Sequence, residues 1–197
     1  MTPAGSAPAT PQQTAALPLL TLDFDGVICA PILGRNIGIH RSFLDPGATP
    51  RPARLWPRRL ADPWDHLRYD LRRPLPEAGV ALATLARVRR LIVLTGRRSS
   101  PERWLRRYGL RAHIERVVIN EGPLRSPHFK LHAVAELGAA EHVDDDPRTA
   151  QLLAQQSAAS VYLRDWPKNR GLPYDAGIAR VHDLAELAAR LAPVGGR

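Results

Sequence analysis

Residues 17–24, LPLLTLDF, and the DGV that follows them at 25–27 decide the fold predicted for this chain of 197 residues. The run is apolar almost throughout and ends in two acids, Asp23 and Asp25, as expected of a strand buried inside a parallel sheet. An acid at the end of such a strand is costly to bury without a purpose. The sequence therefore predicts a central strand with chemistry at its carboxyl end.

Short apolar or β-branched runs alternate with helical stretches along the rest of the chain. Further strands are predicted at 91–95 (LIVLT), 116–119 (RVVI), 141–144 (EHVD) and 160–163 (SVYL). Helices are predicted at 76–89, 101–108, 129–137, from Asp146-Pro147 and from Asp183. This alternation predicts an α/β fold, a doubly wound parallel sheet with helices on both faces. Ligands of such sheets bind at the carboxyl ends of the strands.

Two segments fall outside the alternation. Residues 1–16, rich in Pro, Ala, Thr and Gln, predict a disordered tail ahead of one domain at 17–197. Residues 30–74, rich in Pro, Arg and Trp, predict a small insertion after the first strand. No run approaches the ~20 apolar residues of a membrane span, and the single Cys29 favours a reducing, cytoplasmic setting.

The formal charge is +9, carried by 26 arginines and only two lysines, Lys130 and Lys168. Such an arginine bias is typical of a GC-rich genome, although a basic surface also favours phosphates or nucleic acid. Within residues 31–75, nine arginines stand against four aspartates. The aromatic residues among them are Phe43, Trp56, Trp64 and Tyr69. Arginines with aromatics suit phosphates and stacked bases, and suit equally a basic surface packed on the domain.

Polar residues stand at the predicted strand ends. Asp23 and Asp25 follow the first strand, Thr95 ends the second, and Asp144 and Asp145 follow the fourth. Four carboxylates meeting at one edge would repel one another without a cation, and oxygen ligands favour Mg²⁺. The Thr95 hydroxyl, with Lys130 from the helix before the fourth strand, suits a phosphate.

In this order the residues resemble the four motifs of the haloacid dehalogenase superfamily. DFDGV at 23–27 resembles the first motif and LIVLTG at 91–96 the second. Lys130 in HFKL resembles the third, and HVDDDP at 142–147 resembles the fourth. The resemblance covers nearly the whole globular part, and it implies that the insertion at 30–74 is a cap on a Rossmann-like domain.

The resemblance implies a phosphomonoester hydrolase that works through an aspartyl-phosphate. Asp23 would be the nucleophile, and Asp25 the general acid and then the base. Thr95, Gly96 and Lys130 would bind the phosphoryl group, with Lys130 also neutralising Asp23. Because the acid two residues after the nucleophile marks the phosphatases of the superfamily, dehalogenation is not expected.

The resemblance also implies a Mg²⁺ site. The ligands would be the Asp23 side chain, the Asp25 carbonyl and Asp145, with Asp144 adjacent. Three consecutive aspartates at 144–146 leave open which of Asp144 and Asp145 binds the metal directly.

A small phosphorylated metabolite such as a nucleotide is the expected substrate, because one phosphate needs only Lys130, Thr95 and the metal. A polynucleotide end-phosphatase that uses arginines of the insertion, such as Arg54, Arg58 and Arg59, is the alternative. A non-catalytic nucleic-acid-binding protein that retains the fold is another, and the complete set of acids argues against it.

Three further features, close in sequence to the predicted site residues, are weaker evidence for a role in the site. Arg97 and Arg98 follow Thr95-Gly96 and are expected to be solvated loop charges rather than substrate contacts. His128 and His132 lie four residues apart without a third zinc ligand, so packing or surface roles are expected. Residues 119–123, INEGP, end the third strand, a position from which they would line a pocket.

Overall fold

The computed structural model describes residues 16–31, 39, 41–45, 47–50, 52–53 and 71–192. The predicted tail at 1–16 lies outside these residues except for Ala16, and so does much of the predicted insertion at 30–74, including Trp56, Trp64 and Tyr69. The tail and the cap therefore stay predictions.

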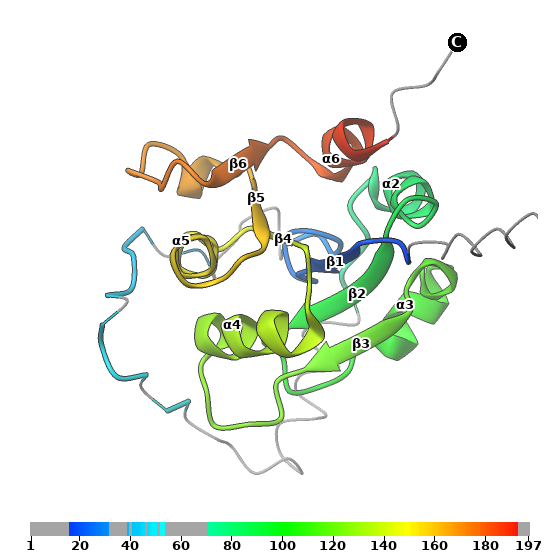
Figure 1. Ribbon diagram of the computed structural model, residues 1–197. Helices are drawn as coiled ribbons and strands as arrows, with labels where there is room; N and C mark the ends of the chain where they lie inside the picture. The colour runs from blue at the N-terminus through cyan, green and yellow to red at the C-terminus, as the bar shows by residue number, and fades with distance from the viewer. Residues whose placement is uncertain are drawn as a thin grey trace, which may run out of the picture.

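Six parallel strands form one sheet in the order β3-β2-β1-β4-β5-β6 (Figure 1). They are β1 (Leu19–Leu22), β2 (Arg90–Thr95), β3 (Arg116–Ile119), β4 (Glu141–Asp144), β5 (Ser160–Arg164) and β6 (Ile178–Val181). The order runs outward from β1 in both directions, because β1 pairs with β2 on one side and with β4 on the other. This confirms the predicted doubly wound parallel sheet and places β1 beside the point where the order reverses, which is where such sheets bind ligands.

Helices cover both faces of the sheet (Figure 1). They are α2 (Ala78–Leu85), α3 (Glu102–Arg107), α4 (Ser126–Leu137), α5 (Pro147–Gln156) and α6 (Leu184–Leu191), with short 3₁₀ helices η2 (Arg111–His113) and η3 (Pro167–Asn169). Residues of α2, α3 and α6 share one buried hydrophobic cluster, and residues of α4 and α5 belong to a second. None of the helices in the described part of the chain combines the length and apolar character needed to cross a bilayer.

Two helix starts follow the predicted capping chemistry. The Asp146 side chain accepts a hydrogen bond from the backbone N–H of Arg148 at the start of α5 (3.1 Å). The Asp183 side chain accepts one from the N–H of Glu186 at the start of α6 (2.8 Å). Each cap satisfies an N–H that has no partner within its helix.

Some boundaries differ from the sequence prediction. β1 stops at Leu22 rather than at residue 24, because the carbonyl of Phe24 accepts the N–H groups of Ile28 and Cys29 and so closes a turn. α4 begins three residues before the predicted 129, at Ser126. β6 is not predicted at all, because the Ala and Arg inside IARV interrupt its short apolar pattern.

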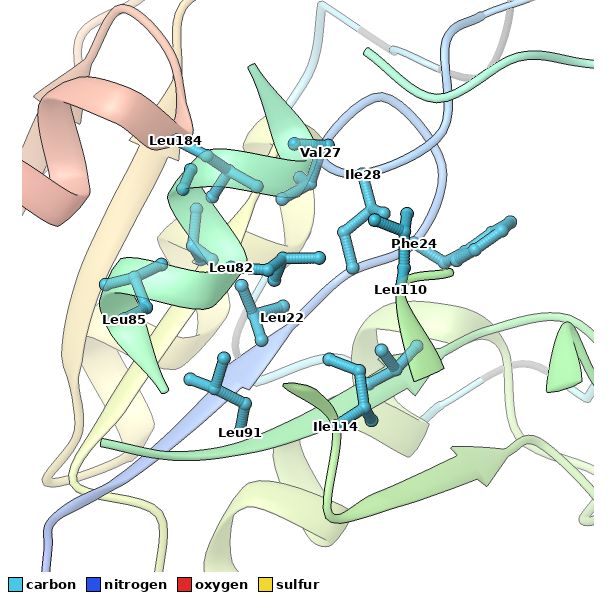
Figure 2. Packing of buried hydrophobic residues seen from close by; sticks show 14 of the residues in the cluster. Leu22, Phe24, Val27, Ile28, Leu82, Leu85, Leu91, Leu110, Ile114 and Leu184 are labelled. Carbon is cyan, nitrogen blue, oxygen red and sulfur yellow. The ribbon is translucent and has the colours of Figure 1, made fainter. Parts of the chain in front are cut away.

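The first hydrophobic cluster packs α2 against the sheet (Figure 2). The side chains of Leu82 and Leu85 on α2 meet Leu22 on β1 and Leu91 on β2, and all four are at most 1% exposed. Val80 lies on the opposite, solvent-facing side of α2 and is 78% exposed. The buried side of the helix is formed by residues 78, 81, 82 and 85. This face of α2 therefore anchors the strand that carries the first motif.

We expect Leu82→Ala to lower the free energy of unfolding by about 2–5 kcal/mol, because it leaves a cavity under α2. The matched control Val80→Ala, on the exposed side of the same helix, should change it by less than about 0.5 kcal/mol. Urea unfolding of both variants measures this, and equal losses would mean that α2 packs through another face.

Candidate active site

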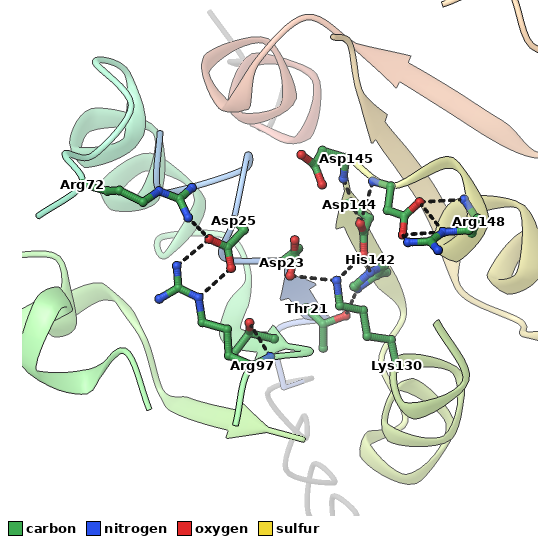
Figure 3. Close-up of polar contacts among 12 residues, drawn as sticks. Thr21, Asp23, Asp25, Arg72, Arg97, Lys130, His142, Asp144, Asp145 and Arg148 are labelled. Atoms are coloured by element: carbon green, nitrogen blue, oxygen red, sulfur yellow. Dashed lines mark hydrogen bonds and ion pairs between the residues drawn. The ribbon is translucent and has the colours of Figure 1, made fainter. Parts of the chain in front are cut away.

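The carboxyl ends of β1, β2 and β4 meet at one edge of the sheet, where they line a hollow of about 250 Å³ (Figure 3). The structure brings every predicted site residue to this hollow: Asp23, Asp25, Thr95, Gly96, Lys130, Asp144 and Asp145. Lys130 reaches it from α4, and the other residues come from strand ends or the turns after them.

Lys130 lies between two carboxylates. Its ammonium nitrogen is 2.7 Å from Asp23 Oδ1 and 2.7 Å from Asp144 Oδ2, and the residue is 2% exposed. Burial by itself lowers the pKa of Lys130, but Asp144 and Asp23 outweigh it and raise that pKa above its usual value. Lys130 is therefore a fixed positive charge.

Both oxygens of Asp144 are occupied (Figure 3). Oδ1 accepts the backbone N–H groups of Asp145 and Asp146, each at 2.9 Å. Oδ2 accepts from Lys130 and lies 3.0 Å from His142 Nε2. Burial raises the pKa of Asp144, but Lys130 and His142 outweigh it and hold that pKa below its usual value. Asp144 is therefore an ionised carboxylate that positions Lys130.

His142 and Thr21 complete this network inside the sheet. Burial lowers the pKa of His142, so its ring is neutral. With Nε2–H donating to Asp144, Nδ1 accepts from the Thr21 hydroxyl, 2.8 Å away. The pairing of β1 with β4 sets Thr21 opposite His142. Neither residue was predicted: Thr21 is a single polar residue within the apolar strand LLTL, and His142 lies in EHVD, where most residues are polar.

Asp23, Asp144 and Asp145 form a buried acidic cluster in which one oxygen from each lies within 4.8 Å of the others. Burial raises the pKa of Asp23 to about 7, aided by Asp144 and Asp25 and opposed by Lys130. Burial also raises the pKa of Asp145 well above its usual value, with Asp23, Asp144 and Asp146 adding to the effect. Three carboxylates buried this close together disfavour one another's charged forms, and their oxygen donors fit a divalent cation.

Asp25 is held by two guanidinium groups. Arg97 donates through Nε to Oδ2 at 2.6 Å and through Nη2 to Oδ1, where Arg72 Nη1 also donates. Burial raises the pKa of Asp25, but Arg97 and Arg72 outweigh it and lower that pKa. Asp25 is therefore ionised in this arrangement, whereas the general-acid role predicted for it requires a proton.

Arg97 corrects a sequence expectation, because it is not a solvated loop charge. Its side chain is 6% exposed, and its guanidinium lies 4.5 Å from the centre of the Phe24 ring. Phe24 and Asp25 are neighbours, so Arg97 stacks on one and pairs with the other. The sequence could not show that the turn at Gly96 directs this side chain back onto the first motif.

A second, larger pocket of about 560 Å³ adjoins the hollow and shares Gly96, Ser126 and Arg148 with it. Its walls come from residues 43–45, 48–49 and 53 of the predicted insertion, from the loop between β3 and α4, and from Arg98. Arg98 was expected to be a solvated loop charge, but it lines this pocket together with Asn120 and His128.

The chain has the fold of the haloacid dehalogenase superfamily, as solved structures show. A haloacid dehalogenase-like hydrolase from Streptococcus pneumoniae has a TM-score of 0.58 and 14% identity, with 90% of this chain and 99% of that chain covered. For one from Xanthomonas campestris the TM-score is 0.57, the identity 13% and the coverage 89% and 94%. For a candidate phosphoglycolate phosphatase from Lactobacillus plantarum they are 0.55, 15%, 88% and 99%. No family profile and no curated protein sequence matches the chain.

Gly96 packs against the first turn of α4, the helix that carries Lys130. A Cβ at Gly96 would lie 2.2 Å from Ser126 Oγ and 2.5 Å from Ser126 Cβ. Gly96→Ala should therefore lower the free energy of unfolding by about 1–3 kcal/mol, and adding Ser126→Gly should restore most of the loss. Gly122→Ala is the control, because nothing lies within 4 Å of a Cβ there. Equal stability of Gly96→Ala and wild type in urea would contradict this packing.

Proposed function

We propose that the protein is a Mg²⁺-dependent phosphomonoester hydrolase that acts through an aspartyl-phosphate on Asp23. The observation that carries the proposal is the contact of Asp23 with Lys130, 2.7 Å apart, within a buried cluster of three carboxylates whose oxygens lie close together. The likeness of the fold to solved hydrolases supports it, because one of them is described as a candidate phosphoglycolate phosphatase.

The chain's own residues supply the attack. One oxygen of Asp23 would bond to phosphorus as the ester oxygen departs, while Lys130 holds the other oxygen and offsets the charge of the phosphoryl group. Thr95, which ends β2 in the same hollow, would donate its hydroxyl to a phosphoryl oxygen. Water then attacks the phosphorus of the aspartyl-phosphate and releases phosphate and free Asp23.

Asp23 and Asp145 would hold the metal. Asp144 lies in the same cluster, but both of its oxygens are already occupied by donors, so we assign it to positioning. A bound Mg²⁺ would neutralise charge on the transferring phosphoryl group. Asp145 comes directly after β4, and its raised pKa reflects a carboxylate that a cation would stabilise.

Asp25 would donate a proton to the leaving oxygen and then accept one from water. Its side chain is 31% exposed, so it can reach the hollow. Because Arg97 and Arg72 hold it ionised, we infer that one of these contacts loosens when a substrate phosphate offers the guanidinium groups another anion.

A small phosphorylated metabolite is the proposed substrate. The polynucleotide alternative depends on Arg54, Arg58 and Arg59, which lie outside the described residues.

Asp23→Asn should remove turnover of an aryl phosphate, because an amide cannot form the acyl-phosphate. Loss of a covalent nucleophile costs on the order of 10⁶-fold in well-studied hydrolases. The control is Asp175→Asn, an exposed aspartate outside the hollow, which should retain activity. Mg²⁺-dependent release of phosphate is the assay, and activity near wild type in a clean Asp23→Asn preparation would remove Asp23 from the mechanism.

For Asp25→Asn the loss should depend on the leaving group. An alkyl phosphate should be hydrolysed about 10²- to 10⁴-fold more slowly, because its alkoxide must be protonated as it leaves. An aryl phosphate with an acidic phenol should lose less. Affinity for Mg²⁺, followed by calorimetry, should persist, since the Asp25 carboxylate pairs with arginines. If Asp23→Asn and Asp25→Asn weakened Mg²⁺ binding equally, this division of roles would be wrong.

A further inference from the structure

The segment that follows β5 holds the backbone at Asp145. Asn169, in η3, is fully buried, and its side-chain nitrogen donates to the carbonyl of Asp145 at 3.1 Å and to that of Arg164 at 2.7 Å. Its side-chain oxygen accepts from the backbone N–H of Trp166 and from Arg180 Nη2, each at 3.0 Å. A side-chain amide has two N–H groups to donate and an oxygen with two lone pairs, so all of its bonding capacity is used. Asn169 is therefore fixed in place, and it links the loop after β4 to the end of β5.

The same segment also holds the turn after β1. Trp166 Nε1 donates to the carbonyl of Gly26 at 3.1 Å, and Gly26 is buried. Arg164 Nη1 donates to the carbonyl of Val27 at 3.1 Å, and the carbon of its guanidinium lies 5.1 Å from the centre of the Trp166 ring. Because β4 lies between β1 and β5 in the sheet, these contacts cross the end of β4.

These contacts tie together the two loops that carry the proposed metal ligands. Asp23 stands three residues before Gly26, and the carbonyl that Asn169 holds is that of Asp145 itself. One oxygen of Asp23 and one of Asp145 lie within 4.8 Å of each other. Because ionised carboxylates this close repel one another, fixed backbone contacts are needed to keep both loops in place before a cation arrives.

We propose that Trp166 and Asn169 are positioning residues for the metal, which hold the loops after β1 and β4 so that oxygens of Asp23 and Asp145 stay within reach of one divalent cation. The inference rests on the proposed function. The described residues that line the catalytic hollow do not include Trp166 or Asn169, so both would act through the backbone. Contacts behind the ligands fix the geometry of a metal site, and their loss typically lowers metal affinity about 10- to 100-fold.

The test is the binding of Mg²⁺ to the full chain without substrate, measured by calorimetry. Trp166→Phe removes the donor to Gly26 and keeps an aromatic ring beside Arg164, and it should raise the Kd for Mg²⁺ about 10-fold. Its turnover of p-nitrophenyl phosphate should fall at limiting Mg²⁺ and return close to the wild-type kcat at saturating Mg²⁺. The matched control is Tyr162→Phe, which removes an aromatic donor to Glu141 on β4 and should leave the Kd unchanged.

Two further variants separate metal positioning from stability. Leu187→Ala, on the buried side of α6, should lower stability toward urea and leave the Kd for Mg²⁺ unchanged. Asn169→Ala should lower stability, because it also loses the contact with Arg180 on β6, and should raise the Kd as well. If Asn169→Ala does not fold, Trp166→Phe decides alone.

A wild-type Kd for Mg²⁺ in folded Trp166→Phe would overturn the inference. An equal rise in Leu187→Ala would also overturn it, as would a loss of kcat that saturating Mg²⁺ does not restore. Asp23→Asn separates the two claims. If it weakens Mg²⁺ binding and stops turnover while Trp166→Phe binds as the wild type does, only the inference fails. If the wild type neither binds Mg²⁺ nor hydrolyses p-nitrophenyl phosphate, the proposed function fails and the inference with it.

Discussion

The Lys130 ammonium, placed 2.7 Å from an oxygen of both Asp23 and Asp144, is the interaction on which the site depends. It joins α4 to the carboxyl ends of β1 and β4. The same contact therefore holds the helix against the sheet and positions Asp23, the proposed nucleophile. A buried ion pair is stable only when its remaining bonding capacity is satisfied. Asp144 meets that condition through two backbone N–H groups and His142. Asp23 and Asp145, in the same buried cluster, then supply the oxygens that would hold the proposed metal.

The parts of the site that could be predicted are those fixed by strand direction. Asp23 and Thr95 each stand at the end of an apolar run and Asp144 at the end of the short strand EHVD, and in a parallel sheet all such ends meet at one edge. Lys130 was a further signal of a functional position, because nearly every other basic side chain in this sequence is an arginine. The Thr21–His142 pair was not visible, because it depends on the register between β1 and β4.

The interactions that could not be predicted come from loops and from the ends of the insertion. Arg72 and Arg97 are 25 residues apart in the sequence, and only the folded chain shows that both pair with Asp25. Arg98, Asn120 and His128 likewise come from three separate segments that meet at the second pocket. Charge and composition mark such residues as polar but contain no information on which of them meet in the folded chain.

The most direct test of the central claim is to trap the covalent intermediate. Enzyme mixed with a phosphomonoester and Mg²⁺ would be quenched in acid and reduced with borohydride, which converts an aspartyl-phosphate into homoserine. Peptide mass spectrometry then locates the change. The account predicts homoserine at position 23, dependent on substrate. Homoserine at another aspartate, or an unmodified Asp23 in enzyme quenched during steady turnover, would contradict it.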